Sequence, residues 1–140
     1  MLNEQVRRIM TKDPVVVSPN ESLESVSALM AERKNQQIPV VEDENQFVGL
    51  VTAYDLWQAG DLEGKTVKDV MNTKVIQITP IDKVGTAAEL FMDKRFKTLP
   101  VVNLRNELKG IVTAFDVLRH VMQREYQPSK TLYPEVFEEQ

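Results

Sequence analysis

The sequence predicts an α+β fold in which two β-α-β-β-α units pack sheet to sheet with pseudo-twofold symmetry. A shift of 61 residues aligns residues 6–57 with residues 67–118 without a gap. In this alignment, residues 49–55 read Gly-Leu-Val-Thr-Ala-Tyr-Asp and residues 110–116 read Gly-Ile-Val-Thr-Ala-Phe-Asp. A fixed period with a matching apolar pattern is typical of stacked supersecondary units, and two copies alone favour a closed pair over a solenoid.

The first copy begins with a β-branched run at residues 14–17 that predicts a strand. Apolar residues at helical spacing follow and predict a helix at residues 23–30. Two further apolar runs, at residues 38–41 and 47–51, flank a polar turn and predict a β-hairpin. A second helix is expected at residues 56–59. The second copy repeats these elements as strands at 75–78, 99–102 and 108–112 and helices at 84–91 and 117–126.

Neither unit is large enough to bury both faces of its own sheet, so we expect the two units to form one compact module. Residues 1–60 are assigned to the first repeat and residues 61–126 to the second, with a linker at residues 60–65. Residues 127–140 contain two prolines and three acidic residues, and we expect them to form an arm or a disordered tail.

Composition narrows the class of protein. With 140 residues and 42% hydrophobic content, the chain can bury a core without a disulfide or a structural metal. The absence of cysteine excludes thiolate metal sites and thiol nucleophiles, and it fits a reducing, cytoplasmic environment. No apolar stretch approaches the ~18 residues that span a bilayer, and the N-terminus has no signal-peptide pattern, so no membrane association is expected. A net charge of −4 without a long basic run argues against nucleic acid as the principal partner.

The repeated Thr-x-x-Asp turn, Thr52 to Asp55 and Thr113 to Asp116, is the main candidate for chemistry. A carboxylate can accept two hydrogen bonds from a vicinal diol, and a threonine hydroxyl at a helix start can face the same ligand. The helix N-terminus adds amides suited to phosphate. The same residues are also typical helix caps with no ligand at all. Capping is the favoured interpretation of the turn alone, and the two roles can coexist.

Several features coincide in both copies: a methionine near the start, a hydroxyl-proline step, a Pro-Val-Val strand and the Thr-x-x-Asp turn after a glycine. Together they resemble a tandem pair of CBS (cystathionine beta-synthase type) domains, also called a Bateman module, over about residues 4–124. The resemblance implies a small stand-alone regulatory protein that binds AMP, ADP, ATP, S-adenosylmethionine or a dinucleotide in two clefts between the repeats. It also implies a disc-shaped homodimer and an attached or separate regulated protein of unknown identity, with no required cofactor.

Carried over residue by residue, the resemblance implies that Asp55 and Asp116 hold the ribose, with Thr52 and Thr113 near ribose or phosphate. Both copies keep both residues, so neither cleft is discarded. The residues expected to enclose the base are Thr11, Lys12, Pro14, Val15, Pro39, Thr73, Lys74, Val75, Ile76 and Pro100.

Spacing adds further phosphate candidates. Arg95 and Lys97 follow the first helix of the second copy, where solvated cations are also common. Arg119 and His120 follow Asp116 by about one helical turn and are expected at the rim of the second cleft. Gly49 and Gly110 permit close approach of either a ligand or a neighbouring strand, and the sequence does not choose between them.

His120 is the only histidine, and the sequence supplies no nucleophile, second base or metal-ligand cluster around it. The leading hypothesis is therefore a non-enzymatic adenine-nucleotide sensor without a metal site. A constitutive dimerisation or interaction protein with empty clefts is the alternative, and a small phosphate-hydrolysing enzyme is a weaker third. A homodimer is expected through apolar residues of each copy's second helix, and Tyr54 and Phe115 are assigned to packing or interface rather than to stacking on adenine. Those apolar residues are Leu56, Trp57, Val117, Leu118 and Val121.

Overall fold

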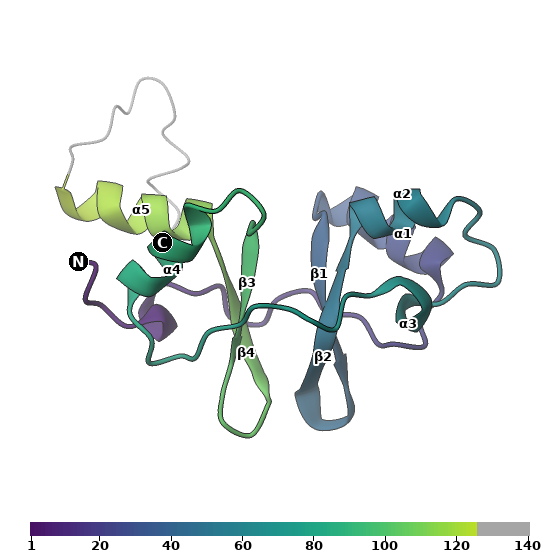
Figure 1. The fold of residues 1–140 in the computed structure, drawn as a ribbon, viewed down its shortest axis with the longest axis horizontal. Helices are drawn as coiled ribbons and strands as arrows, with labels where there is room; N and C mark the ends of the chain where they lie inside the picture. The colour runs from purple at the N-terminus through teal and green to yellow at the C-terminus, as the bar shows by residue number, and fades with distance from the viewer. Residues whose placement is uncertain (126–140) are drawn as a thin grey trace.

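The computed structural model describes residues 1–125, and it shows two similar halves side by side (Figure 1). Each half contains one two-stranded antiparallel sheet. The two sheets lie next to each other at the centre, and the helices lie toward the outside (Figure 1). The expected α+β fold with sheet-to-sheet packing is confirmed. No helix within the described residues is long and apolar enough to cross a bilayer.

The first half follows the predicted order of helix, hairpin and helix. The hydroxyl of Ser22 accepts a hydrogen bond from the backbone N–H of Ser25 at 3.1 Å, which starts the first helix. In the hairpin, Val40 lies opposite Gly49 and a register shift follows. The elements of this half are α1 (Leu23–Arg33), β1 (Gln37–Glu42), β2 (Gln46–Thr52) and α2 (Ala53–Ala59), with a 3-10 turn at Asp43–Asn45.

The second half repeats this arrangement, with Val101 opposite Gly110 and the same register shift after it. The predicted end of its last helix at Tyr126, and the whole predicted tail at 127–140, lie outside the described residues. Its elements are α4 (Val84–Phe91), β3 (Thr98–Val102), β4 (Leu108–Thr113) and α5 (Ala114–Glu125). Two short helical segments come earlier in the chain than α1 and α4, respectively: η1 (Val6–Arg8) and α3 (Val67–Val70).

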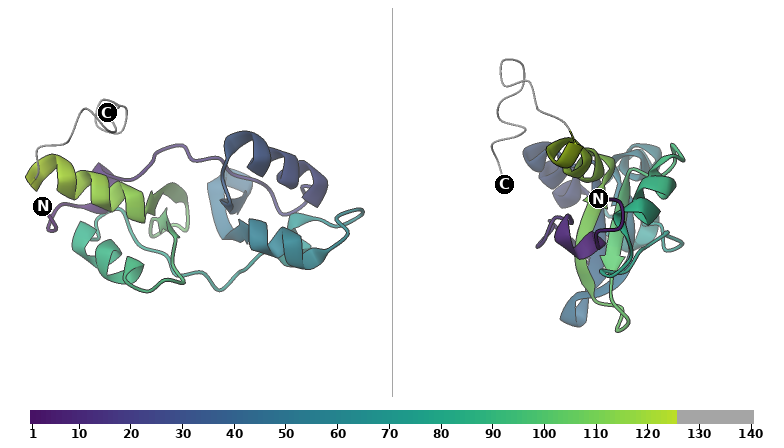
Figure 2. Two further views of the ribbon diagram at one scale, coloured as in Figure 1. Left: turned by 90° about the horizontal axis from the view of Figure 1, so that it is seen from above. Right: turned by 90° about the vertical axis from the view of Figure 1, so that its left-hand side faces the viewer.

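The prediction of regular strands at 14–17 and 75–78 is wrong, because each segment forms only a single parallel bridge with the neighbouring strand. Val17 donates to the carbonyl of Pro39 at 3.2 Å and accepts from Val41 at 3.0 Å. Ile78 makes the equivalent pair of bonds in the second half. The residues before each bridge leave the sheet to cross to the other half (Figure 2), where Thr11 pairs with Ile111. Because each segment crosses to the other half at this point, its pairing with the neighbouring strand does not extend beyond one bridge.

The crossing exchanges the first segment of each copy between the halves. Val6 is fully buried in the core of the second half, against Ile78, Val84 and Leu99. Val67, its equivalent in the second copy, is buried in the core of the first half. Backbone bonds fix both positions: the N–H of Val6 donates to Asp82 at 2.7 Å, and that of Val67 donates to Glu21 at 3.0 Å. Each half is therefore built from both sequence copies.

The hairpin ends join the two sheets directly. Phe47, Val102 and Leu108 form a small apolar cluster between them. Asn106 accepts at its carbonyl from the N–H of Phe47 and donates its side-chain amide to the Phe47 carbonyl, both at 2.9 Å. Asn45 donates its side-chain amide to the carbonyl of Leu108. These contacts hold the halves in one fixed arrangement in this structure.

Gly49 and Gly110 are explained by backbone packing. A Cβ atom at Gly49 would lie 2.6 Å from the carbonyl oxygen of Asn72. At Gly110 it would lie 2.6 Å from the carbonyl oxygen of Thr11. The crossing segments approach these strands so closely that only glycine fits, so the neighbouring-strand interpretation left open by the sequence accounts for both residues.

Candidate functional site

Both Thr-x-x-Asp turns form capping boxes. The hydroxyl of Thr52 accepts from the N–H of Asp55 at 3.2 Å, and the Asp55 carboxylate accepts from the N–H of Thr52 at 2.9 Å. Thr113 and Asp116 make the same pair of bonds at 3.2 and 2.9 Å. The capping role is thus confirmed in both copies. Each carboxylate keeps further lone pairs for a ligand, because two oxygens provide about four acceptor positions.

A cleft of 340 Å³ lies between η1 and α5, and we call it the Asp116 cleft. It brings together three of the predicted ligand residues, Asp116, Arg119 and His120. Its other walls come from the exchanged N-terminal segment and from the later turns of α5. The complete lining is Arg8, Ile9, Met10, Asp116, Arg119, His120, Gln123 and Arg124.

Asp116 is only 6% exposed, and its carboxylate is held from two sides. Besides the capping bond, its second oxygen lies 3.5 Å from the guanidinium of Arg119. The same guanidinium lies over the ring of Phe115, 5.5 Å from its centre. His120 is buried, and its Nε2 lies 3.1 Å from the carbonyl oxygen of Met1. Asp116, Arg119 and His120 are therefore each held in place by contacts within the protein.

A second cleft of 270 Å³ lies between α2 and α3, and we call it the Asp55 cleft. Lys65 lies beside it, and its ammonium group donates to the carbonyl of Ala59 at 2.7 Å. The residues that line this cleft are Asp55, Gln58, Ala59, Asp69 and Val70. Each is the 61-residue equivalent of a residue lining the Asp116 cleft. The two clefts are therefore symmetry-related sites.

Arg95 and Lys97, predicted as phosphate contacts, line neither cleft. Arg95 instead pairs with Asp93 in the loop after α4, with nitrogen and oxygen 2.7 Å apart. The side-chain hydrogen bonds from Arg95 lower the pKa of Asp93 to about 2. Lys97 is exposed in the same loop.

The residues predicted to enclose the base are spread over other parts of the molecule, and none lines either cleft. Pro39 and Pro100 are buried within β1 and β3. Thr11 pairs with Ile111, and Val75 packs beside the apolar cluster between the sheets. Pro14 borders a separate cavity of 300 Å³. The exposed members are Thr11, Lys12, Thr73, Lys74 and Ile76, and Val15 packs against the first core.

Several cleft residues were missed by the sequence interpretation. Arg8 and Met10 reach the Asp116 cleft only because the N-terminal segment is exchanged, and Asp69 reaches the Asp55 cleft for the same reason. Gln58 and Arg124 lie one or two turns beyond the motif aspartates, so helical spacing could have found them. Within residues 1–125, no three His, Asp or Glu side chains are grouped as metal ligands.

Comparison with known proteins decides the family. The CBS domain model matches residues 6–56 and again residues 67–123, which together make up most of the chain. The chain belongs to the CBS domain family. Its two matches coincide with the two copies of the repeat, so the chain is a tandem CBS pair.

Solved CBS pairs share the fold over nearly the whole described chain. The CBS-pair protein CBSX2 from Arabidopsis thaliana is 28% identical, with a TM-score of 0.82 over 90% of this chain and 99% of that chain. A structure of CBSX2 in complex with AMP is 30% identical, with a TM-score of 0.79 over 86% and 98%. The CBS domain pair of MJ0100, in complex with 5′-methylthioadenosine and S-adenosyl-L-methionine, is 25% identical, with a TM-score of 0.73 over 84% and 98%.

CBS pairs also occur inside longer enzymes. Inosine-5′-monophosphate dehydrogenase from Mycobacterium tuberculosis is 37% identical over 112 residues, which are 79% of this chain and 21% of that enzyme. The chain spans 47% of another curated relative, the uncharacterized protein MJ1225 from Methanocaldococcus jannaschii, so it covers less than half the length of either protein. The shared part in each case is the CBS pair.

Proposed function

We propose that this CBS pair is a regulatory module that binds an adenosine-containing ligand such as AMP, ADP, ATP or S-adenosylmethionine. The observation that carries the proposal is the presence, in both copies, of a Thr-x-x-Asp helix start whose aspartate lines a cleft. The complexes of CBSX2 with AMP and of MJ0100 with two adenosyl compounds support this ligand class. The clefts contain acceptors for ribose hydroxyls and, at Asp116, cations for phosphate.

The exchanged segments give the ligand a way to act on the whole module. One wall of the Asp116 cleft is α5, whereas the facing wall is η1 from the other sequence copy. A ligand that contacts both walls stabilises the arrangement in which they lie at the bound distance, because it can shift an equilibrium only through differential affinity. The partner would then respond to that conformational or oligomeric change.

We also propose that the chain catalyses no reaction by itself. Within residues 1–125, His120 bonds to a backbone carbonyl, and Asp55 and Asp116 are held in capping boxes. A hydrolytic site needs a nucleophile or an activated water next to a positioned base. Neither cleft combines these groups. When a CBS pair belongs to an enzyme, the chemistry can therefore lie in the rest of that chain.

A thermal-shift screen with AMP, ADP, ATP and S-adenosylmethionine tests the proposal. A ligand that binds only the folded state stabilises it by about 2.7 kcal/mol at ~100 times its Kd. For a domain of this size, the melting temperature should rise by several degrees. No shift with any of the four compounds at millimolar concentration would contradict the ligand-binding function.

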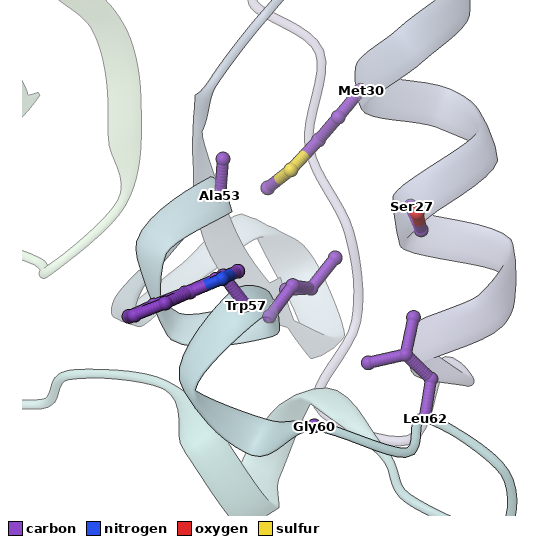
Figure 3. A pocket seen from close by; sticks show the side chains of 7 residues that line it. Ser27, Met30, Ala53, Trp57, Gly60 and Leu62 are labelled. Carbon is purple, nitrogen blue, oxygen red and sulfur yellow. The ribbon is translucent and has the colours of Figure 1, made fainter.

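A constitutive dimerisation protein remains a second candidate, because each half has an apolar groove between its two outer helices. The groove between α1 and α2 has a volume of 530 Å³ and includes the exposed ring of Trp57 (Figure 3). Its counterpart between α4 and α5 has a volume of 340 Å³. The first groove is lined by Ser27, Met30, Ala53, Leu56, Trp57, Gly60 and Leu62. A stable dimer with no response to any adenosyl compound would favour this candidate.

A further inference from the structure

The two clefts occupy equivalent positions but carry opposite charge. Arg8 lines the Asp116 cleft, and its equivalent in the Asp55 cleft is Asp69. The equivalent of Arg119 in the Asp55 cleft is the uncharged Gln58. The Asp116 cleft thus has two arginines around one aspartate at the matched positions, whereas the Asp55 cleft has two aspartates and no cation.

We propose that the two clefts select different adenosine ligands: the Asp116 cleft takes a phosphate-bearing nucleotide, and the Asp55 cleft takes an adenosine compound without phosphate. This proposal rests on the adenosine-binding function proposed above. A phosphate brought next to Asp55 and Asp69 would be repelled by both carboxylates, since like charges repel each other. An uncharged or cationic ligand meets no such barrier.

Arg119 is arranged to meet a phosphate. Its guanidinium is held between the carboxylate of Asp116 and the ring of Phe115, so little side-chain freedom remains to be lost on binding. A guanidinium has five N–H donors, and the contact with one carboxylate oxygen leaves most of them free. Arginine also binds phosphate oxygens in a bidentate manner. Arg124 lies one further turn along α5 and lines the same cleft.

Arg8 completes the phosphate-binding wall from the opposite side. It lies on η1, the segment that the first sequence copy contributes to the second half. Exchange of the first segments therefore determines the charge of each cleft: it places Arg8 beside Asp116 and Asp69 beside Asp55. Lys65, beside the Asp55 cleft, donates to the carbonyl of Ala59 and does not line the cleft.

Calorimetric titration of the full chain with AMP and with adenosine tests the proposal. AMP is expected to bind with one molecule per chain, and adenosine added to the AMP-saturated protein is expected to bind with one further molecule. Arg8→Gln and Arg119→Gln should each weaken AMP binding by about ten- to a hundredfold, as loss of a charged hydrogen bond does. Arg7→Gln is the matched control, because Arg7 lies on the same turn, bonds to Gln5 and lines neither cleft.

Salt dependence of the wild-type protein gives an independent readout that needs no variant. Raising the ionic strength should weaken AMP binding and leave adenosine binding unchanged, because salt screens the attraction between arginine and phosphate. Two equal AMP sites per chain, or equal effects of Arg7→Gln and Arg8→Gln, would overturn the selectivity while leaving the adenosine-binding function intact. Binding of neither AMP nor adenosine would overturn both.

Discussion

Asp55 and Asp116 show how one residue can serve the fold and a ligand together. Each aspartate closes a capping box at the start of a helix, and each also lines a cleft. The two residues differ in surroundings: Asp116 is nearly buried and pairs with Arg119, whereas Asp55 has no ion pair within the described residues. Substitution can therefore separate the two roles.

Replacement of the aspartates by asparagine should leave the fold nearly unchanged and weaken ligand binding. The asparagine carbonyl can still accept the threonine N–H, so Asp55→Asn should change the free energy of unfolding by less than about 1 kcal/mol, chiefly through the helix dipole. Asp116→Asn should cost more, because it also removes the partner of Arg119. Urea denaturation measures both changes.

The same variants report the binding role of the carboxylates. Loss of charged hydrogen bonds worth about 1.5 to 3 kcal/mol should weaken AMP binding to Asp116→Asn by about ten- to a hundredfold. Calorimetry on both single variants and the double variant measures this effect. Wild-type affinity for AMP and adenosine in all three proteins would refute the ribose role of these residues.

Among the elements, the crossing segments lie so close to strands β2 and β4 that they leave no room for a side chain at Gly49 or Gly110. Gly49→Ala and Gly110→Ala would each place a methyl group 2.6 Å from a backbone oxygen. Relief of such overpacking requires backbone shifts, so each substitution should destabilise the protein by about 1 to 3 kcal/mol. Lys109→Ala, at an exposed position of the same strand as Gly110, should change stability by less than about 0.5 kcal/mol. Equal melting temperatures for all three variants would contradict the packing argument.

Most elements could be predicted from the sequence because their signals are local. Helical periodicity located α1 and α4, and turn residues between apolar runs located both hairpins. The exchange of η1 and α3 could not be predicted in this way. Val6 and Val67 are equivalent in the repeat, so the same apolar pattern fits packing within a copy or between copies. The single bridges at Val17 and Ile78 were overestimated as strands for the same reason, since the crossing itself is a tertiary feature.

The candidate site was predicted in part. The motif and one helical turn beyond it identified Asp55, Asp116, Arg119 and His120, which do line the clefts. Arg8 was missed because its place depends on the exchange. Leu56 and Val117, expected in an interface, are mostly buried in the cores, and only a small part of each residue reaches the apolar grooves.

For the whole molecule, the exposed apolar residues of the outer helices predict a homodimer. Trp57 is 76% exposed and Leu118 is 58% exposed, and they occupy equivalent positions in the two apolar grooves. Apolar surface of this kind is typical of interfaces. Static light scattering should show a dimer for the wild type and a shift toward monomer for Trp57→Glu and Leu118→Glu.

Leu104→Glu is the control for this prediction. Leu104 is fully exposed, but it lies in the turn between β3 and β4 and lines neither groove. This variant should remain a dimer. A monomeric wild type across a broad concentration range, with and without AMP, would contradict the predicted assembly.

Native mass spectrometry of the full chain incubated with AMP is the most direct test of adenosine-ligand binding, since it reports ligand mass and subunit number in one spectrum. We expect the wild-type chain to carry AMP and the Asp116→Asn variant to carry much less of it at the same AMP concentration. A spectrum in which the wild-type chain carries no AMP, S-adenosylmethionine or adenosine at millimolar ligand would contradict the assignment of this CBS pair as an adenosine-binding module.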